Sequence, residues 1–241
     1  MRKLTVLVAA LLLLGATEAA PDFQFALLRY EGGNWSPRSN GLSRLSWEIR
    51  KRTSIHTSLN VAHVSAESDE LFNYPIVFWQ GDTGFPKLSS IAVTQLRQFL
   101  KRGGTLVVDL SDGQPQGPFD LSVRRELRRI FPAQKLERIE SDHVLYKSFY
   151  LLDRHGGRVP ARAHLEGIML EERLAVIQVA NDMAGAMARD EFGAWKYDVQ
   201  AGGDTAREIT FRLGINLVMY ALCLDYKEDQ VHIPFILQRR Q

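Results

Sequence analysis

Polar residues follow two short apolar segments, 75–79 and 105–110, and their types could bind a ligand or a cation. They are Gly81, Asp82, Thr83 and Gly84 after the first segment, and Asp109, Ser111 and Asp112 at the end of the second. Glycines let backbone amides approach a ligand, and carboxylates can hold a divalent cation or act as a general base. Turn or helix-cap formation is the simpler explanation for each residue taken alone.

Two further pairs of polar residues are candidates. Asp142-His143 is the one adjacent acid–imidazole pair among the six histidines, and His143 could act as a general base or a metal ligand. A histidine bonded to a backbone carbonyl is the simpler explanation. Asn181 and Asp182 follow the β-branched segment 173–179 and could line the same edge as the first group, or form a turn.

The sequence lacks the signatures of several well-known chemistries. The single cysteine, Cys223, lies between two leucines near the end of the last predicted helix, which predicts a buried thiol rather than a nucleophile. One cysteine excludes an internal disulfide and a cysteine-based zinc site. Leu110-Ser111-Asp112-Gly113 is not a G-x-S-x-G elbow, and no phosphate loop or dinucleotide fingerprint is present. We therefore expect no cofactor, although the strand-end carboxylates could hold a divalent cation.

Alternating apolar and amphipathic segments predict the elements that position these residues. Strands are predicted over 23–30, 60–64, 75–79 and 105–110, a hairpin over 166–180, and helices over 42–49, 90–102, 121–131 and 205–222. Ser90 is expected to cap the second helix, and Thr205 and Glu208 to form a capping box on the last one. Strand, helix and strand succeed one another from Pro75 to Leu110, so these strands should be parallel and end at one edge. The alternation favours a three-layer α/β/α sandwich with a mainly parallel sheet.

Composition and charge restrict the class of protein. The 241 residues are 45% hydrophobic and 24% charged, as in a folded soluble protein. The net charge of +2 gives no strong field for nucleic acid, so no nucleic-acid partner is expected. Four arginines, Arg124, Arg125, Arg128 and Arg129, are predicted to form a solvated helix face that could also contact an acidic partner.

The N-terminus has the order of a secretory signal peptide. Arg2 and Lys3 precede an apolar segment from Leu4 to Gly15, and small residues follow up to Ala20. We expect a signal peptide over 1–19 and a single α/β domain over 20–241, with 225–241 as a C-terminal extension. The protein would then be periplasmic or secreted, without a stable membrane anchor. The alternative is an uncleaved anchor, but the apolar segment is shorter than the ~20 residues that span a bilayer.

An ordered series of segments runs along the chain: FQFALLRYEGGNW (23–35), ELFNYPIVFWQGDTGF (70–85), LRQFLKRGGTLVVDLSDG (96–113), RRELRRIFP (124–132), DHVLYKSFY (142–150) and RLGINLVMYAL (212–222). Together these segments resemble the bacterial family catalogued as domain of unknown function 4159. The resemblance implies a flavodoxin-like sheet related to class I glutamine amidotransferases, and no established activity. Those enzymes carry a cysteine on a strand-to-helix elbow, whereas this chain has only Cys223, so their glutaminase chemistry is not expected.

Two functions remain open at this point. The first is a non-catalytic binding or interaction module, with an envelope protein as partner. The second is a hydrolase-like enzyme that uses Asp82, Asp109, Asp112 and His143, with a divalent cation as an option. Converging side chains in one strand-end site would favour the enzyme, and scattered ones would favour the module.

The signal-peptide interpretation predicts that the mature protein begins at Ala20. Proline just past the scissile bond is a poor substrate, so Pro21 disfavours cleavage after Ala20 and favours cleavage after Ala19. N-terminal sequencing or intact-mass analysis of protein from its native envelope measures this. Recovery of a Met1 N-terminus in the membrane fraction would show that the segment is an anchor.

Overall fold

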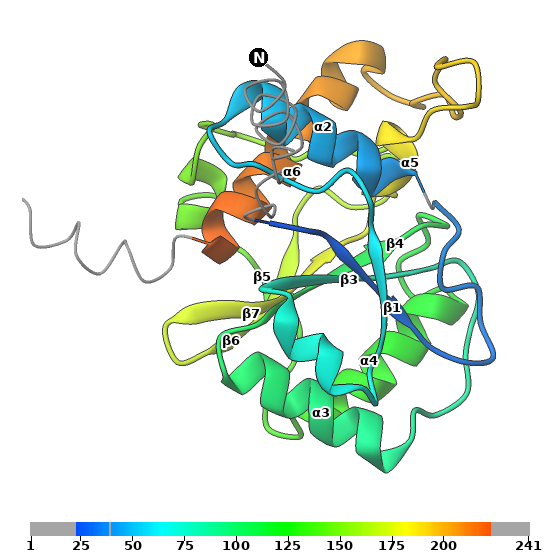
Figure 1. The fold of residues 1–241 in the computed structure, drawn as a ribbon, viewed down its shortest axis with the longest axis vertical. Coiled ribbons are helices and arrows are strands. Elements are labelled where there is room, and N and C mark those ends of the chain that lie inside the picture. The colour runs from blue at the N-terminus through cyan, green and yellow to red at the C-terminus, as the bar shows by residue number, and fades with distance from the viewer. Residues whose placement is uncertain (1–22, 39, 223–241) are drawn as a thin grey trace, which may run out of the picture.

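Seven strands form one sheet in the order β2-β1-β3-β4-β7-β6-β5 (Figure 1). The structure is a computed structural model that describes residues 23–38 and 40–222. The strands β2, β1, β3, β4 and β7 are parallel, and β6 and β5 continue the sheet in antiparallel fashion. Their bounds are Ala26–Arg29 (β1), Ala62–Ser65 (β2), Ile76–Gly81 (β3), Thr105–Leu110 (β4), Glu137–Arg138 (β5), Glu166–Leu170 (β6) and Arg173–Val179 (β7).

Helices cover both faces of the sheet, which confirms the three-layer α/β/α prediction. On one face lie α2 (Gly41–Arg52), α5 (Met183–Met187), α6 (Gly203–Leu222) and the 3₁₀ helix η2 (Val144–Lys147). On the other face lie α3 (Ser90–Lys101), α4 (Pro118–Ile130) and the 3₁₀ helix η1 (Asp69–Asn73). Figure 1 shows α3 and α4 below the sheet and α2, α5 and α6 above it.

The central strands are buried on both faces, as their continuous apolar sequences predict. All six residues of β3 and all six of β4 are buried. Val77 and Trp79 pack with the α3–α4 layer, whereas Ile76 and Phe78 pack with the layer of α2 and α6. The side chains alternate because successive residues of a strand point to opposite faces.

Three helix boundaries differ from the sequence-based expectation. Ser89, not Ser90, caps α3, since the Ala92 amide donates to the Ser89 hydroxyl at 3.1 Å. Helix α4 begins at Pro118 rather than near Leu121, because proline is well accommodated in the first turn of a helix. The capping box on α6 is wrong: α6 begins at Gly203, and the Glu208 carboxylate accepts hydrogen bonds from Arg52 and Arg212 instead.

The arginines of α4 are not a solvated face. Arg124 donates to Asp120 at 2.9 Å, and Arg125 and Arg129 both pair with the buried carboxylate of Glu126. A buried carboxylate needs such partners because its desolvation is costly. Three of the four arginines are therefore bonded within the molecule, which leaves little of this face for an acidic partner.

Several sequence-based expectations lie outside the described residues. These are the signal peptide over 1–19, Cys223 and the extension over 225–241. Among residues 23–38 and 40–222, no helix has the length and apolar character needed to cross a membrane.

The position of the α3 cap can be tested with two neighbouring serines. Ser89→Ala removes the hydroxyl that accepts the Ala92 amide and should lower the free energy of unfolding by about 1 kcal/mol. Ser90→Ala is the matched control, because Ser90 is exposed in the first turn and alanine is a good helix former. Urea denaturation of both variants measures this. A larger loss for Ser90→Ala would place the cap at Ser90.

Candidate functional site at the carboxyl edge of the sheet

Two pairs of neighbouring strands end with the chain turning to opposite faces of the sheet. After β1 the chain forms α2 on one face, and after β3 it forms α3 on the other. The same divergence occurs between β4, followed by α4, and β7, followed by α5. Ligands of open α/β sheets bind at such points. The ends of β3 and β4, where we expected a shared site, are both followed by helices on the same face, so the candidate positions lie on either side of that pair.

At the β4/β7 end, two aspartates are completely buried. The Asp109 carboxylate accepts hydrogen bonds from the backbone amides of Met183 and Ala184 at 2.8 and 2.9 Å, so it sits on the N-terminus of α5. Asp182 caps the same helix from a left-handed backbone conformation (φ 52°) and accepts from the Gly185 amide at 3.0 Å. Asp182 and Asp109 therefore lie at one edge of the sheet, as expected, but both carboxylates accept backbone amides of α5.

Two arginines from distant loops compensate the charge of Asp182. Arg38 donates from Nε to Asp182 Oδ1 at 3.1 Å and from Nη2 to Oδ2 at 3.0 Å, and Arg158 pairs with the same carboxylate. Arg38 Nη2 also donates to the Ser111 carbonyl at 2.8 Å, and its guanidinium lies 4.4 Å from the Tyr197 ring centre. Arg38 thus joins the segments that follow β1, β4 and β7.

Burial changes the acidity of Asp109. Desolvation raises the pKa of its carboxyl group, and the negative charge of Asp182 raises it further, to about 7. The amides of Ala184 and Met183 and the charge of Arg38 act in the opposite direction. A buried acid with a raised pKa is a common feature of active sites, but here each carboxylate oxygen is already occupied by a backbone donor.

At the carboxyl ends of β1 and β3, hydrogen bonds join the loops that follow these two strands. The Asn34 side chain donates to Asp82 Oδ2 at 3.0 Å, and the Asn34 amide donates to the Thr83 hydroxyl at 3.1 Å. Gly32 has φ +73°, and a Cβ there would lie 2.4 Å from Pro86 Cδ. Only glycine permits this approach, so the glycine pair after β1 allows the loops to close on one another.

The glycine at the end of β3 is required by packing. A Cβ on the buried Gly81 would lie 2.2 Å from the Phe119 ring and 2.5 Å from the Tyr30 hydroxyl. Tyr30 donates that hydroxyl to the Gln80 carbonyl at 2.8 Å, and burial, followed by the charge of Asp82, raises its pKa. Aromatic side chains therefore fill the space beside Gly81 that a ligand would need.

Asp112 lies close enough to Asp82 for their charges to interact. Its Oδ1 accepts the Gln114 amide at 3.1 Å, and burial raises the pKa of Asp112, with smaller contributions from the charges of Asp82 and Asp120. Within the described part of the chain, no group of three or more His, Cys, Asp or Glu side chains is arranged to hold a metal ion. Asp82, Asp109 and Asp112 thus do not form the three-carboxylate cluster that we considered.

His143 lies at the other end of the sheet. Its Nδ1 accepts the Leu145 amide at 3.1 Å, and its ring centre is 5.8 Å from that of Tyr220, whose hydroxyl accepts the Leu174 amide. Leu174 is the second residue of β7 and lies five positions before Val179, which pairs with Asp109, so the separation along the strand is roughly 16 Å. The proposal that His143 acts together with the strand-end aspartates is wrong.

Asn181 and Ser111 are also held inside the protein. Asn181 accepts the Arg162 amide at 2.9 Å and donates to the Arg162 carbonyl at 3.1 Å, while its amide group lies 3.3 Å from His155 Nε2. Burial lowers the pKa of His155 to about 4. The Ser111 hydroxyl is buried, and no described residue provides it with a hydrogen-bond partner, so no base is positioned to activate it.

Sequence reasoning missed Arg38, Arg158, Asn34 and Tyr197. All of them lie in irregular segments, where no periodic pattern marks a buried position. The signal that could have found them is indirect: two buried aspartates at one strand end require cationic partners, and arginine is the usual one. Which of the chain's many arginines would serve could not be read from spacing.

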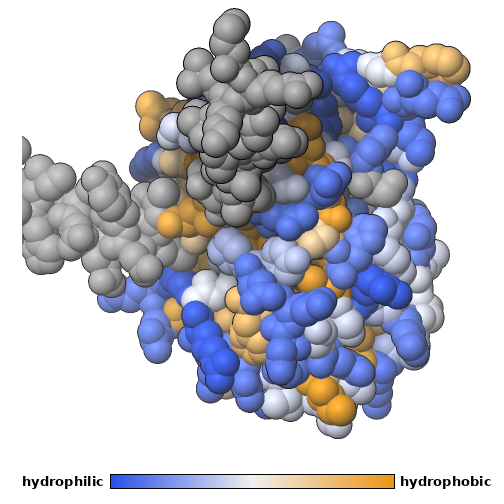
Figure 2. All heavy atoms as spheres, in the orientation of Figure 1, coloured by the Kyte–Doolittle hydropathy of each residue, from blue (hydrophilic) through white to orange (hydrophobic). Residues whose placement is uncertain are grey.

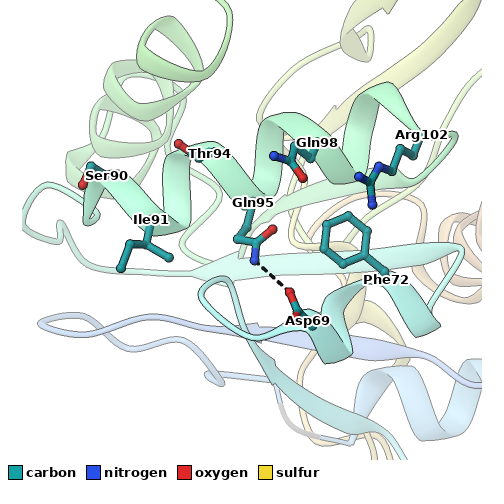
Figure 3. Close-up of a pocket in the computed structure, with 8 residues that line it drawn as sticks. All are labelled: Asp69, Phe72, Ser90, Ile91, Thr94, Gln95, Gln98 and Arg102. Atoms are coloured by element: carbon teal, nitrogen blue, oxygen red, sulfur yellow. Dashed lines mark hydrogen bonds between the residues drawn. The ribbon is translucent and has the colours of Figure 1, made fainter.

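Concave surfaces lie beside the strand ends and on the outer helices. A cavity of about 300 Å³ adjoins the ends of β1 and β2, with a lining that includes Arg29, Tyr30, Glu31, Glu67, Lys87 and Ser89. A larger groove of about 690 Å³ runs along the exposed side of α3 (Figure 3). In Figure 3, Gln95 donates to Asp69 across this groove, a distance of 2.9 Å, and the other side chains shown are mainly uncharged. In the first cavity the Ser89 hydroxyl donates to the Glu67 carboxylate at 2.5 Å, but the same hydroxyl accepts the Ala92 amide as the cap of α3.

Comparison with known protein families identifies the family of this chain. The model of the family described as Domain of unknown function (DUF4159) matches residues 24–222, so the chain belongs to that family. A search of curated proteins finds no match. The relation to class I glutamine amidotransferases stays a prediction, although β2-β1-β3-β4 follow the order of a flavodoxin-like sheet.

The packing role of Gly81 predicts a difference between this last residue of β3 and Gly84 in the loop that follows. Gly81→Ala should lower the free energy of unfolding by about 1–3 kcal/mol, because its methyl group overlaps Phe119. Gly84→Ala is the matched control, since its Cβ would meet Pro118 at an ordinary 3.4 Å. Chemical denaturation compares them. Equal stability of the two variants would contradict the packing role.

The raised pKa of Asp109 predicts a pH dependence that an asparagine variant lacks. Because the native pKa lies above the unfolded value, protonation favours the native state, and wild-type stability should fall as pH rises from about 4 to about 7. Relative to Asp109→Asn, the loss should approach about 1.4 kcal/mol per pH unit within this window. Urea titrations of both proteins at several pH values measure it. A stability difference independent of pH would show that Asp109 titrates as an ordinary aspartate.

Proposed function

We propose that the chain is a non-catalytic binding or protein-interaction module of the bacterial envelope. The observation that carries this proposal is that the buried acids at the strand ends are bonded within the protein. Asp109 caps α5 through both oxygens, and Asp182 is paired with Arg38 and Arg158. A catalytic carboxylate must reach the reacting atoms, whereas these two are fully buried and bonded to the protein.

The surroundings of the two other catalytic candidates, Ser111 and His143, support the same conclusion. In the described ranges, Ser111 has no hydrogen-bonded base, and His143 is at the opposite end of the sheet. The envelope location rests on the N-terminal sequence, whose basic, apolar and small-residue order is that of a secretory signal. An envelope protein is the partner class that such a module would meet.

A cation-dependent hydrolase is the second candidate, and one observation favours it. Asp82 and Asp112 raise the local negative charge, and Asp82 Oδ1 is buried without a hydrogen-bond partner among the described residues. A bound cation would offset both effects. Against this, the described residues offer no third ligand.

Thermal melts separate the two candidates. The module predicts that magnesium, calcium, manganese and chelator leave the melting temperature of the wild-type protein unchanged, and that Asp82→Asn responds identically. Gln114→Ala, which keeps both carboxylates, is the control for local loop effects. A cation-induced stabilisation that Asp82→Asn abolishes, together with cation-dependent hydrolysis of model esters or phosphoesters, would establish the hydrolase instead.

A further inference from the structure

A tight hairpin over residues 189–196, which we call the 189–196 hairpin, follows α5. Its backbone is closed by hydrogen bonds from the Asp190 amide to the Ala194 carbonyl (2.9 Å) and from the Gly193 amide to the Asp190 carbonyl (3.1 Å). Asp190 Oδ1 also accepts the amides of Phe192 and Ala194 at 3.0 and 2.8 Å. The tip therefore has a defined conformation without any contact to another molecule.

The base of the hairpin is fixed to the helices beneath it. The Lys196 amide donates to the Ala188 carbonyl at 3.0 Å, next to α5. The Trp195 ring centre lies 3.7 Å from the Arg189 guanidinium and 4.1 Å from that of Arg207, a residue of α6. These contacts hold the base of the hairpin against α5 and α6.

This fixed hairpin exposes a phenylalanine. Phe192 is 88% exposed, the largest exposed fraction among the large hydrophobic side chains of the described residues. Figure 1 shows the segment after α5 projecting at the upper right, and Figure 2 shows hydrophobic atoms on that projection, separate from the small patches elsewhere on this face. An aromatic side chain presented on an ordered loop loses little entropy on binding, which is typical of an interface anchor.

The two acids directly before Phe192 favour a protein partner over an anionic membrane, since the two cations of the hairpin, Arg189 and Lys196, face the rings of Trp195 and Tyr197. Asp190 and Glu191 are both exposed and precede it directly. Anionic lipid surfaces repel such acids. The surface that fits this tip is an apolar cavity with an unpaired cation at its rim.

The chain itself carries such a cavity beside β5, the last strand at one edge of the sheet. A volume of about 630 Å³ lies between the end of α4, β5 and β6, within the range of sites that take a small apolar group. Its apolar lining comprises Pro132, Ala133, Ile139, Met169 and Leu174. On the rim, Lys135 pairs with Glu137 and Arg138 with Glu140, and Asp142 adds an acid. Arg128, also on the rim, has no ion pair within the described part of the chain.

We infer that Phe192 of one copy of this chain inserts into the β5–β6 cavity of a second copy, with Glu191 against Arg128. The donor and the acceptor are different surfaces, so the contact is heterologous and joins copies head to tail. This inference deepens the proposed function of an interaction module, since it names a second copy of the chain as one partner. A single anchored side chain buries little area, so the association is weak and concentration-dependent.

Sedimentation equilibrium of the purified protein over a range of concentrations tests this. The average mass of the wild type should rise with concentration, and Phe192→Ser, Arg128→Glu and Glu191→Lys should each weaken the association at least tenfold, as expected for loss of an anchor. Mixing Arg128→Glu with Glu191→Lys should restore it, because the opposite charges again face each other. Leu151→Ser is the matched control, because Leu151 is also exposed (83%) but lies outside both surfaces and should leave the association unchanged.

Three outcomes would overturn the inference. They are a wild type that stays monomeric at all concentrations, an association that Phe192→Ser does not weaken, and a binding to anionic vesicles that Phe192→Ser abolishes. None of these outcomes depends on whether cations change the melting temperature. Failure of the Phe192 contact can therefore be distinguished from failure of the proposed function. Unchanged melting temperatures of the variants confirm that they are folded, since exposed side chains contribute little to stability.

Discussion

The complete burial of two carboxylates at one strand end is the constraint on which the architecture of this edge depends. Asp109 and Asp182 lie close enough to repel each other, and desolvation alone would make their charged forms costly. The structure compensates with the N-terminus of α5 and with the guanidinium groups of Arg38 and Arg158. The loops after β1 and β4 and the segment around Arg158 are thereby tied to the end of β7. A loop conformation that withdrew both arginines would leave the Asp182 carboxylate buried without a cationic partner.

This compensation explains why the edge that serves as a ligand site in many α/β proteins is interior here. The Arg38 side chain lies at the carboxyl ends of β4 and β7 and bonds to Asp182 there. At the carboxyl ends of β1 and β3, the Asn34–Asp82 hydrogen bond joins the two following loops. Polar residues that suggest catalysis in the sequence thus stabilise loops. Exposed apolar side chains lie elsewhere, Phe192 on the 189–196 hairpin and Met169 in β6.

The sequence predicted the elements whose signal is periodic or continuous. The apolar segments of β3 and β4, the helix stripes of α2 and α3, and the β6–β7 hairpin all have such patterns, and the structure confirms them. The sequence pattern could not predict β5, which has only two residues. It also could not predict that Ser89 rather than Ser90 caps α3, because both serines satisfy the same preference. Residue types alone suggested a site at the strand ends. They could not reveal that Arg38, from an irregular loop, fills it, since long-range ion pairs leave no local pattern.

Arg38 and Asp182 act as one structural unit, and a double-mutant cycle measures the coupling between them. Arg38→Met, Asp182→Asn and the double variant are compared with the wild type by urea denaturation at pH 7.5. We expect that the single losses do not add and that the coupling free energy is about 2 kcal/mol or more, as for buried charged partners. Additive losses, with a coupling near zero, would show that the two side chains are independent and would contradict it.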